Sequence, residues 1–127
     1  MPENHLFEYA IIRIVPKVER EEFLNIGVVL YCKKLDFLKA KYLINEDRLR
    51  LFCDTVDIGE LKNYLQSFEQ ICKGSKEGGT IGELDMASRF RWLTATRSTI
   101  LQTSKVHPGL CEDAEEGLAR LFTQLVL

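Results

Sequence analysis

Seven consecutive residues, IGVVLYC at 26–32, are apolar at nearly every position. A strand with one face in water alternates apolar and polar residues, so this continuous run indicates a central strand covered on both faces. Segments 7–15 and 37–44 also have the composition of strands, either rich in β-branched and aromatic residues or alternating with lysine. Pro16 ends the first of them, because proline cannot donate a hydrogen bond to a sheet. The first 44 residues therefore predict three strands.

Helices are predicted after these strands, and the clearest of them spans 57–74. Asp57 and Glu60 form a capping pair at its start, apolar residues recur at helical spacing, and Gly74 stands where a C-terminal glycine cap belongs. Similar patterns predict helices at 45–53, at 80–95 with Thr80 as its N-cap, and at 113–127. A fourth strand is predicted at 98–106, followed by a turn at Pro108 and Gly109.

The predicted order is three strands, three helices, one strand and one helix. Strands that come first and helices that come later are typical of an α+β fold. We expect a mostly antiparallel sheet of about four strands with helices packed on one face. With 127 residues the chain can bury one core, so we expect a single domain over 1–127. The strand at 98–106 can pair beside any of the first three.

Charge and cysteine content argue against several classes of protein. A sequence pI of about 5.7 disfavours nucleic-acid binding, which depends on a positive field over the phosphates. No apolar run approaches the roughly 18 to 20 residues of a membrane span, and the N-terminus has no features of a secretory signal. We therefore expect a cytoplasmic protein that does not enter a membrane. The cysteines lack metal-binding spacing, so we expect reduced thiols and no metal at Cys32, Cys53, Cys72 and Cys111.

The sequence contains no recognisable catalytic constellation. No HExxH, GxSxG, P-loop or dinucleotide-binding glycine motif occurs. Cys111 and His107 could form a nucleophile pair, but four residues apart across a predicted turn the two side chains need not meet. We therefore expect a protein that is not an enzyme and has no cofactor.

The segment 86–111 contains no acidic residue, although the whole chain is slightly acidic, with 19 Asp and Glu against 17 Lys and Arg. Forked guanidinium donors fit carboxylates and phosphates, and neighbouring hydroxyl and backbone N–H groups can complete an anion site. The candidate anion- or ligand-binding residues are Arg89, Arg91, Arg97, Ser98, Thr99 and His107. Three interpretations stay open: pairing with acids of the same chain, an anionic or phosphate-bearing ligand, and a protein partner.

Two polar residues interrupt the predicted sheet. Arg13 lies inside an otherwise apolar strand, and Asn25 directly precedes the buried strand. A buried polar group without a hydrogen bond costs about 1 to 3 kcal/mol, so each of these residues needs a partner. We expect a structural polar contact that fixes the strand register, with Glu22 as the carboxylate that pairs with Arg13.

Two long segments carry a family resemblance: YAIIRIVP followed by EREEFLNIGVVLYC, and FRWLTATRSTILQTSKVHPGLC with a final helix that ends in LFTQLV. They resemble the bacterial proteins grouped as Domain of Unknown Function 3037. The matching residues are Arg13 and Pro16, then Glu22, Phe23, Asn25, Gly27, Val28 and Val29, and finally Arg97, Ser98, Thr99, His107, Pro108 and Gly109. Lys105 stands where similar proteins often have proline, which makes the strand end less rigid here.

The resemblance implies no reaction, because this family has no established activity. Genes for such proteins often lie beside a gene for a kinase resembling the toxin kinase HipA, which implies a protein partner. The resemblance thus favours a small non-enzymatic accessory or partner-binding module. The alternative is an anion- or phosphate-ligand sensor or enzyme that uses residues 89–109. A homodimer through the predicted strand 37–44 is a further expectation, although Lys39 and Lys41 also protect an edge against pairing.

Overall fold

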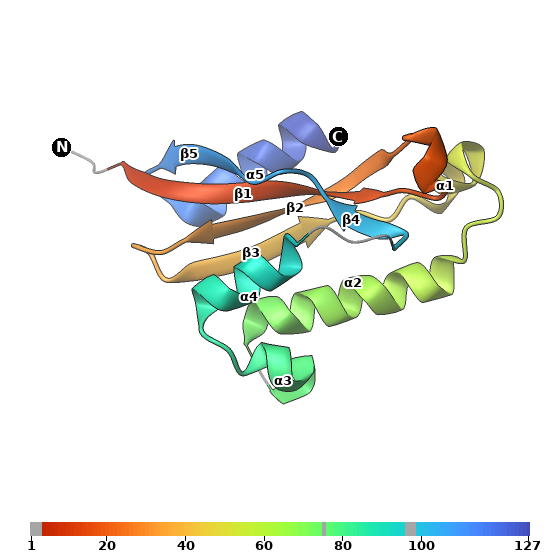
Figure 1. Ribbon diagram of the computed structural model, residues 1–127. Coiled ribbons are helices and arrows are strands. Elements are labelled where there is room, and N and C mark those ends of the chain that lie inside the picture. Colours follow the sequence, from red (N-terminus) through yellow and green to blue (C-terminus); the bar gives the residue numbers. More distant parts are fainter. Residues whose placement is uncertain (1–3, 75, 96–98) are drawn as a thin grey trace.

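The computed structural model describes residues 4–74, 76–95 and 99–127. It has an antiparallel sheet with helices on both of its faces (Figure 1). The strands are β1 (His5–Ile14), β2 (Leu24–Cys32), β3 (Phe37–Tyr42), β4 (Leu101–Thr103) and β5 (His107–Cys111). The α-helices are α1 (Glu46–Phe52), α2 (Ile58–Lys73), α3 (Gly79–Gly82), α4 (Met86–Leu93) and α5 (Ala114–Leu125). Short 3-10 turns η1 (Val18–Arg20) and η2 (Lys76–Gly78) connect some of them.

The strand order is β3-β2-β1-β4, with β5 also paired to β1. Both β4 and β5 therefore use the same edge of the long strand β1, β4 near its end and β5 near its beginning. Between them Ser104 keeps the chain on β1, because its N–H donates to the Ile11 carbonyl and its Oγ accepts from the Ile11 N–H, each at 2.8 Å. The sheet thus has five strands in the described part of the chain, one more than the sequence predicted.

The central position of 26–32 is confirmed, since β2 is buried from Ile26 to Cys32. Its side chains enter two separate cores, one on each face of the sheet. Tyr31 packs in the core beneath α1, α2 and α4, whereas Val28 and Leu30 pack in the core beneath α5. The α+β class and the antiparallel sheet are confirmed, but α5 lies on the face opposite the other helices. A strand that is apolar on both faces requires this second cover.

Edge strand β3 contributes directly to the attachment of α5. Lys39 forms an ion pair of 2.8 Å with Glu115, and the Lys41 ammonium lies 5.1 Å from the centre of the Phe122 ring. The two lysines therefore point to the α5 face of an edge strand, where they contact the helix as well as solvent. Homodimer formation through this edge remains a prediction.

The ends of α1 and α2 agree with their predicted capping residues. Asn45 accepts from the Arg48 N–H at 3.1 Å, and Asp57 accepts from the Glu60 N–H at the same distance. Gly74 ends α2 in the left-handed conformation, with φ of 74°. Capping depends on residues a few positions apart, which is why sequence alone locates these boundaries.

Three predicted boundaries in the second half of the chain are wrong. The strand predicted at 98–106 is shorter, because β4 covers only Leu101–Thr103. The helix predicted at 80–95 is divided into α3 and α4, and α4 begins at Met86 because Asp85, not Thr80, accepts a capping hydrogen bond, here from the Ser88 N–H. The predicted turn at Pro108 and Gly109 lies inside β5. An edge strand tolerates proline because its outer side needs no N–H donor.

Candidate functional site

Arg89 is a buried structural residue, with 7% of its surface exposed. Its Nη1 donates to the carbonyls of Ile71 and Cys72 at 2.9 and 2.7 Å, and its Nε donates to the Leu84 carbonyl at 3.0 Å. The last carbonyls of a helix have no partner within the helix, and this guanidinium supplies donors to the end of α2. Arg89 therefore acts inside the chain, through helix carbonyls rather than the expected acidic side chains.

Arg91 is exposed on α4 and contributes to a separate hollow of about 250 Å³. Lys33, Glu8 and Tyr31 line the same hollow. The Tyr31 ring packs against Phe90 with 5.3 Å between ring centres, and burial raises the pKa of its hydroxyl. Within the described part of the chain Arg91 forms no ion pair. This cation therefore remains available to a ligand.

His107 lies on the other face of the sheet from Arg91. It is opposite Tyr9 across the β1–β5 pair, and the two rings lie 5.5 Å apart between centres. Tyr9 packs towards the α5 core, and successive residues of a strand point to opposite faces, which places Tyr9 away from Glu8 and the Arg91 hollow. The histidine and the arginine do not converge on one site.

Of the remaining candidates, the structure describes only Thr99. Thr99 donates from Oγ1 to the Leu101 carbonyl at 2.7 Å, whereas Arg97 and Ser98 lie outside the described residues. Cys111 is four positions from His107 on the same extended strand, which separates the two by roughly 13 Å along the backbone. Burial is the main cause that raises the pKa of the Cys111 thiol. The geometry therefore gives no support to a nucleophile pair.

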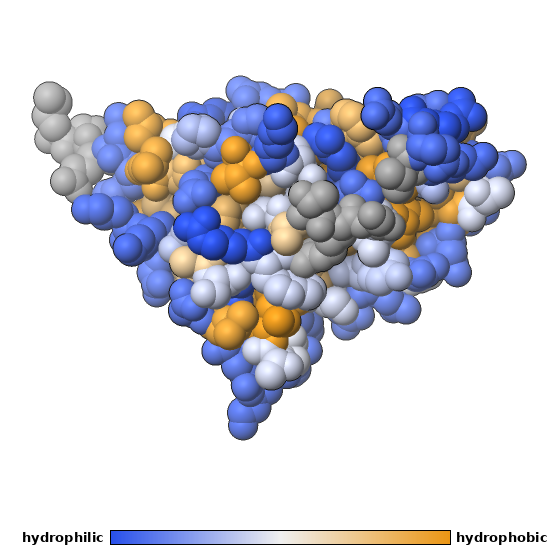
Figure 2. All heavy atoms as spheres, in the orientation of Figure 1, coloured by the Kyte–Doolittle hydropathy of each residue, from blue (hydrophilic) through white to orange (hydrophobic). Residues whose placement is uncertain are grey.

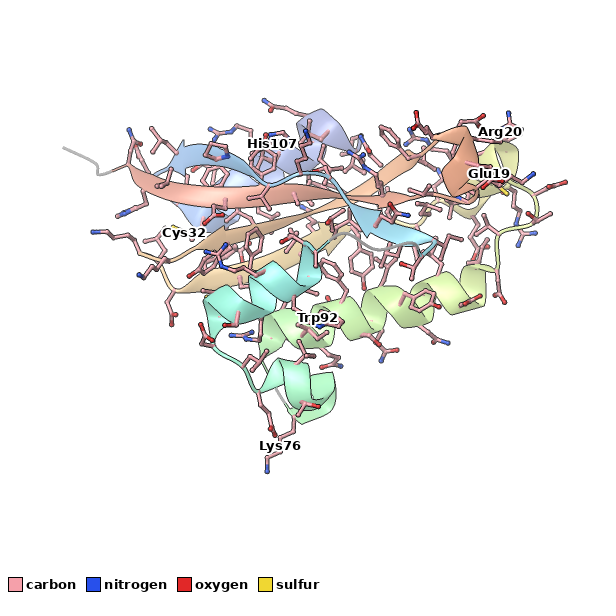
Figure 3. All side chains as sticks on the ribbon, viewed as in Figure 1. Glu19, Arg20, Cys32, Lys76, Trp92 and His107 are labelled. Carbon is pink, nitrogen blue, oxygen red and sulfur yellow. The ribbon has the colours of Figure 1, made fainter. Side chains whose placement is uncertain are left out.

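The acid-free segment does contribute to an apolar groove, which we call the Trp92 groove. Its volume is about 180 Å³, and it is lined by Tyr64, Ser67, Phe68 and Ile71 of α2, Trp92 and Leu93 of α4, and Thr99 and Leu101. Trp92 and Tyr64 keep 41% and 40% of their surfaces exposed, whereas the Phe68, Ile71 and Leu93 side chains are buried. Figure 3 shows Trp92 where α4 lies alongside α2. The groove thus combines an exposed aromatic rim with a buried apolar floor.

A hydrogen bond orients Tyr64 in the aromatic rim of the Trp92 groove. The Tyr64 hydroxyl donates to the Glu60 carboxylate at 3.0 Å, one helical turn away, and this hydrogen bond raises the pKa of Tyr64. The space-filling view shows a separate group of apolar residues over the region of α3 and α4, set among hydrophilic residues (Figure 2), whereas α2, α4 and β4 contribute to the Trp92 groove. An exposed aromatic rim above an apolar floor, as in the groove, is typical of a protein-binding surface.

The two polar residues of the sheet, Arg13 and Asn25, lie next to each other, but Arg13 does not contact the expected partner Glu22. Arg13 and Asn25 are opposite each other across β1 and β2, next to a register shift. The Arg13 guanidinium lies 4.0 Å from the centre of the Phe23 ring, and Glu22 instead forms an ion pair of 2.7 Å with Arg20. Asn25 donates to the Leu125 carbonyl at 3.3 Å. The expected Arg13–Glu22 pair is thus replaced by a cation–π contact, and Asn25 joins β2 to the end of α5.

The described ranges 4–74, 76–95 and 99–127 contain neither a side-chain cluster that could hold a metal ion nor a helix that could span a membrane. No group of three or more His, Cys, Asp and Glu side chains is placed to hold a metal ion there. None of the helices in those ranges has both the length and the apolar character of a membrane span.

Residues 9–126 match the family described as Protein of unknown function (DUF3037). The chain belongs to this family. In this DUF3037 member the match covers all five strands except the start of β1, together with every helix described above. No curated protein and no solved structure matches the chain.

Sequence reasoning missed the part of this DUF3037 member where η1 lies against the end of α1. Arg20 of η1 and Arg50 of α1 line one hollow there, together with Cys53. The two contributing segments are some thirty residues apart in sequence, and no motif links them.

Proposed function

We propose that this chain is a non-enzymatic accessory module that binds a protein partner through the Trp92 groove. The observation that carries the proposal is the groove's exposed rim of Trp92 and Tyr64 above a floor of buried apolar side chains. Tryptophan and tyrosine dominate the energetic centres of protein interfaces, because they bury a large area at a small cost in side-chain entropy. A groove of about 180 Å³ has room for one or two apolar side chains of a partner.

The partner that we propose is a kinase resembling HipA, because the family resemblance associates such chains with that kind of protein. An accessory role needs no reactive group in this chain, and it agrees with the distance between His107 and Cys111 along β5. Helices α2 and α4, which line most of the groove, would then form the surface that contacts the kinase.

Trp92→Ala is expected to weaken binding of this kinase at least about thirtyfold, the effect of removing a central interface tryptophan. The measurement is isothermal titration calorimetry with the purified kinase and the full chain. Leu51→Ala is the matched control, because Leu51 is 89% exposed and lies outside the groove, so its affinity should match that of the wild type. Equal affinity of Trp92→Ala and the wild type, or no binding by the wild type, would contradict the proposal.

Anion binding near 89–109 is the second candidate function, and Arg91 favours it. This cation shares its hollow of about 250 Å³ with Lys33 and the edge of Tyr31. Phosphate or a nucleotide should then raise the melting temperature of the wild type by several degrees at fixed ionic strength, and Arg91→Gln should lose that shift. An equal shift in the wild type and the variant would contradict a ligand site at Arg91.

A further inference from the structure

A hollow larger than the Arg91 hollow and the Trp92 groove lies where the connection between β1 and β2 meets the segment 50–55, and we call it the Cys53 hollow. Its volume is about 440 Å³, within the range of small-molecule sites. Figure 3 places Arg20 at this end of the molecule, where η1 lies beside α1. Pro16, two residues beyond the end of β1, and Phe52, the last residue of α1, contribute apolar wall.

Cations outnumber acids in the lining of the Cys53 hollow. Lys17, Arg20 and Arg50 carry positive charge, and Glu22 and Asp54 carry negative charge. Arg20 and Glu22 neutralise each other in their ion pair of 2.7 Å. Lys17 and Arg50 form no ion pair with any described residue, so two cations against Asp54 leave the hollow positive.

The backbone beside these charges has an unusual conformation. Glu21 lies between Arg20 and Glu22 and has φ of 55°, in the left-handed region that non-glycine residues seldom adopt. Such a conformation costs about 1 to 3 kcal/mol, and residues of this kind cluster at ligand-binding sites. Here it reverses the chain so that the side chains on either side of Glu21 meet and line the same hollow.

Cys53 differs from the other cysteines of the chain. Cys32, Cys72 and Cys111 are buried, whereas Cys53 is partly exposed in the hollow. Burial raises the pKa of Cys72 to about 12, but the hydrogen bond between the Cys53 sulfur and Thr55 Oγ1, 3.2 Å apart, is the main cause that lowers the pKa of Cys53. Partial burial and the Asp54 carboxylate oppose this effect, and the charge of Lys17 adds a smaller contribution in the same direction as Thr55. Cys53 therefore combines partial exposure with a lowered pKa, which favours the nucleophilic thiolate, and it reports on the hollow.

We propose that the Cys53 hollow binds a small organic anion, with its phosphate or carboxylate group held between Lys17 and Arg50. Arg50 supplies a planar fork of donors that fits either group, and Lys17 supplies a point charge. The Thr55 hydroxyl and the Asp54 carboxylate can hydrogen-bond to polar groups on the rest of the ligand, and Phe52 offers an apolar surface. This site does not depend on the Trp92 groove or on a partner protein.

The first test measures the charge of the hollow through the alkylation rate of Cys53. Iodoacetate is an anion and iodoacetamide is neutral. The rate with iodoacetate divided by the rate with iodoacetamide therefore reports the electrostatic potential at Cys53. The pKa of the thiol affects both rates equally and cancels. Arg50→Gln should lower this ratio about threefold at low ionic strength, the effect of one unit charge a few ångströms away. Lys17→Gln should lower the ratio in the same way. The test therefore still works if one of the two variants does not fold.

The second test measures binding. At fixed ionic strength, orthophosphate or citrate should slow the alkylation of Cys53 by iodoacetamide in the wild type, with saturation, and the protection should be lost in Arg50→Gln. Comparison of the two anions shows whether phosphate or carboxylate is preferred. Arg91→Gln is the matched control, because it removes the same charge from another hollow and should keep full protection.

Three outcomes would overturn the proposal. The first is an unchanged rate ratio in both Arg50→Gln and Lys17→Gln. The second is the absence of saturable protection by either anion, since a positive field without binding is no site. The third is loss of protection in Arg91→Gln but not in Arg50→Gln. Peptide mass analysis verifies that Cys53 is the residue modified.

Discussion

Arg89→Ala is expected to lower the free energy of unfolding by about 3 to 4 kcal/mol, which corresponds to a fall of roughly 10 °C or more in melting temperature. The substitution removes donors from the carbonyls of Ile71, Cys72 and Leu84, which accept from the guanidinium at 2.7 to 3.0 Å. It also leaves a cavity where a side chain that is 7% exposed had been. Urea denaturation followed by circular dichroism measures the loss.

The shape of the site explains why arginine is needed there. A Cβ atom built on Gly74, which has φ of 74°, would lie 2.7 Å from Nη1 of Arg89. The glycine that ends α2 therefore also makes room for the guanidinium that caps its carbonyls. Lysine has one nitrogen and cannot reach the carbonyls on both sides, so Arg89→Lys should recover only part of the loss.

Arg91→Ala is the control for this prediction. It removes the same side chain from the same helix, but Arg91 is exposed and its substitution should change stability by no more than about 0.5 kcal/mol. If Arg89→Ala were as mild as Arg91→Ala, the capping role assigned to Arg89 would be wrong.

Local signals predicted the first half of the fold well. The caps at Asp57 and Gly74 fix both ends of α2 through residues within one turn, and the apolar run at 26–32 marks the strand with a core on each face. The boundary at α4 failed because Thr80 and Asp85 are both good capping residues, and sequence cannot tell which of them begins a helix. Tertiary packing around α3 decides between them.

The roles of the charged residues could be predicted only in part. The acid-free segment left three interpretations open for its arginines, and sequence could not show that Arg89 finds partners 17 and 18 residues away, at the end of another helix. Arg13 faces an aromatic ring rather than a carboxylate. The Cys53 hollow combines Lys17 with Arg50, and their proximity depends on how α1 packs at the end of β1, which no local pattern encodes.

Gly109→Ala is expected to destabilise the protein by about 2 to 4 kcal/mol, through overpacking and the loss of buried aromatic surface. Gly109 is opposite Phe7 across β1 and β5, and a Cβ atom at this position would lie 2.3 Å from Cζ of the Phe7 ring. That ring is 3% exposed and belongs to the core beneath α5, so it cannot move aside without leaving the core. Thermal and urea denaturation both measure the effect.

A double-mutant cycle with Phe7→Leu identifies the cause. Leucine lacks the far end of the ring, so Phe7→Leu should cost about 1 to 1.5 kcal/mol alone and little or nothing in the Gly109→Ala background. Gly59→Ala is the matched control, because the nearest atom to its added Cβ is Asp57 Oδ1 at 3.4 Å and alanine favours the helix. That variant should be neutral or more stable by about 0.5 to 1 kcal/mol. Additive losses in the cycle would show that the two side chains do not compete for space.

The same experiment distinguishes the two accounts of the His107–Pro108–Gly109 run. If Gly109 served a turn, as its sequence suggested, its substitution would act through backbone conformation and would not depend on residue 7. In the structure Gly109 is not among the glycines with positive φ, which are Gly74 and Gly79. Its role is to leave space for a ring on the neighbouring strand, so coupling to Phe7 is the expected signature. The glycine is thus required by the packing of β5 against β1, which positions the chain for its entry into α5.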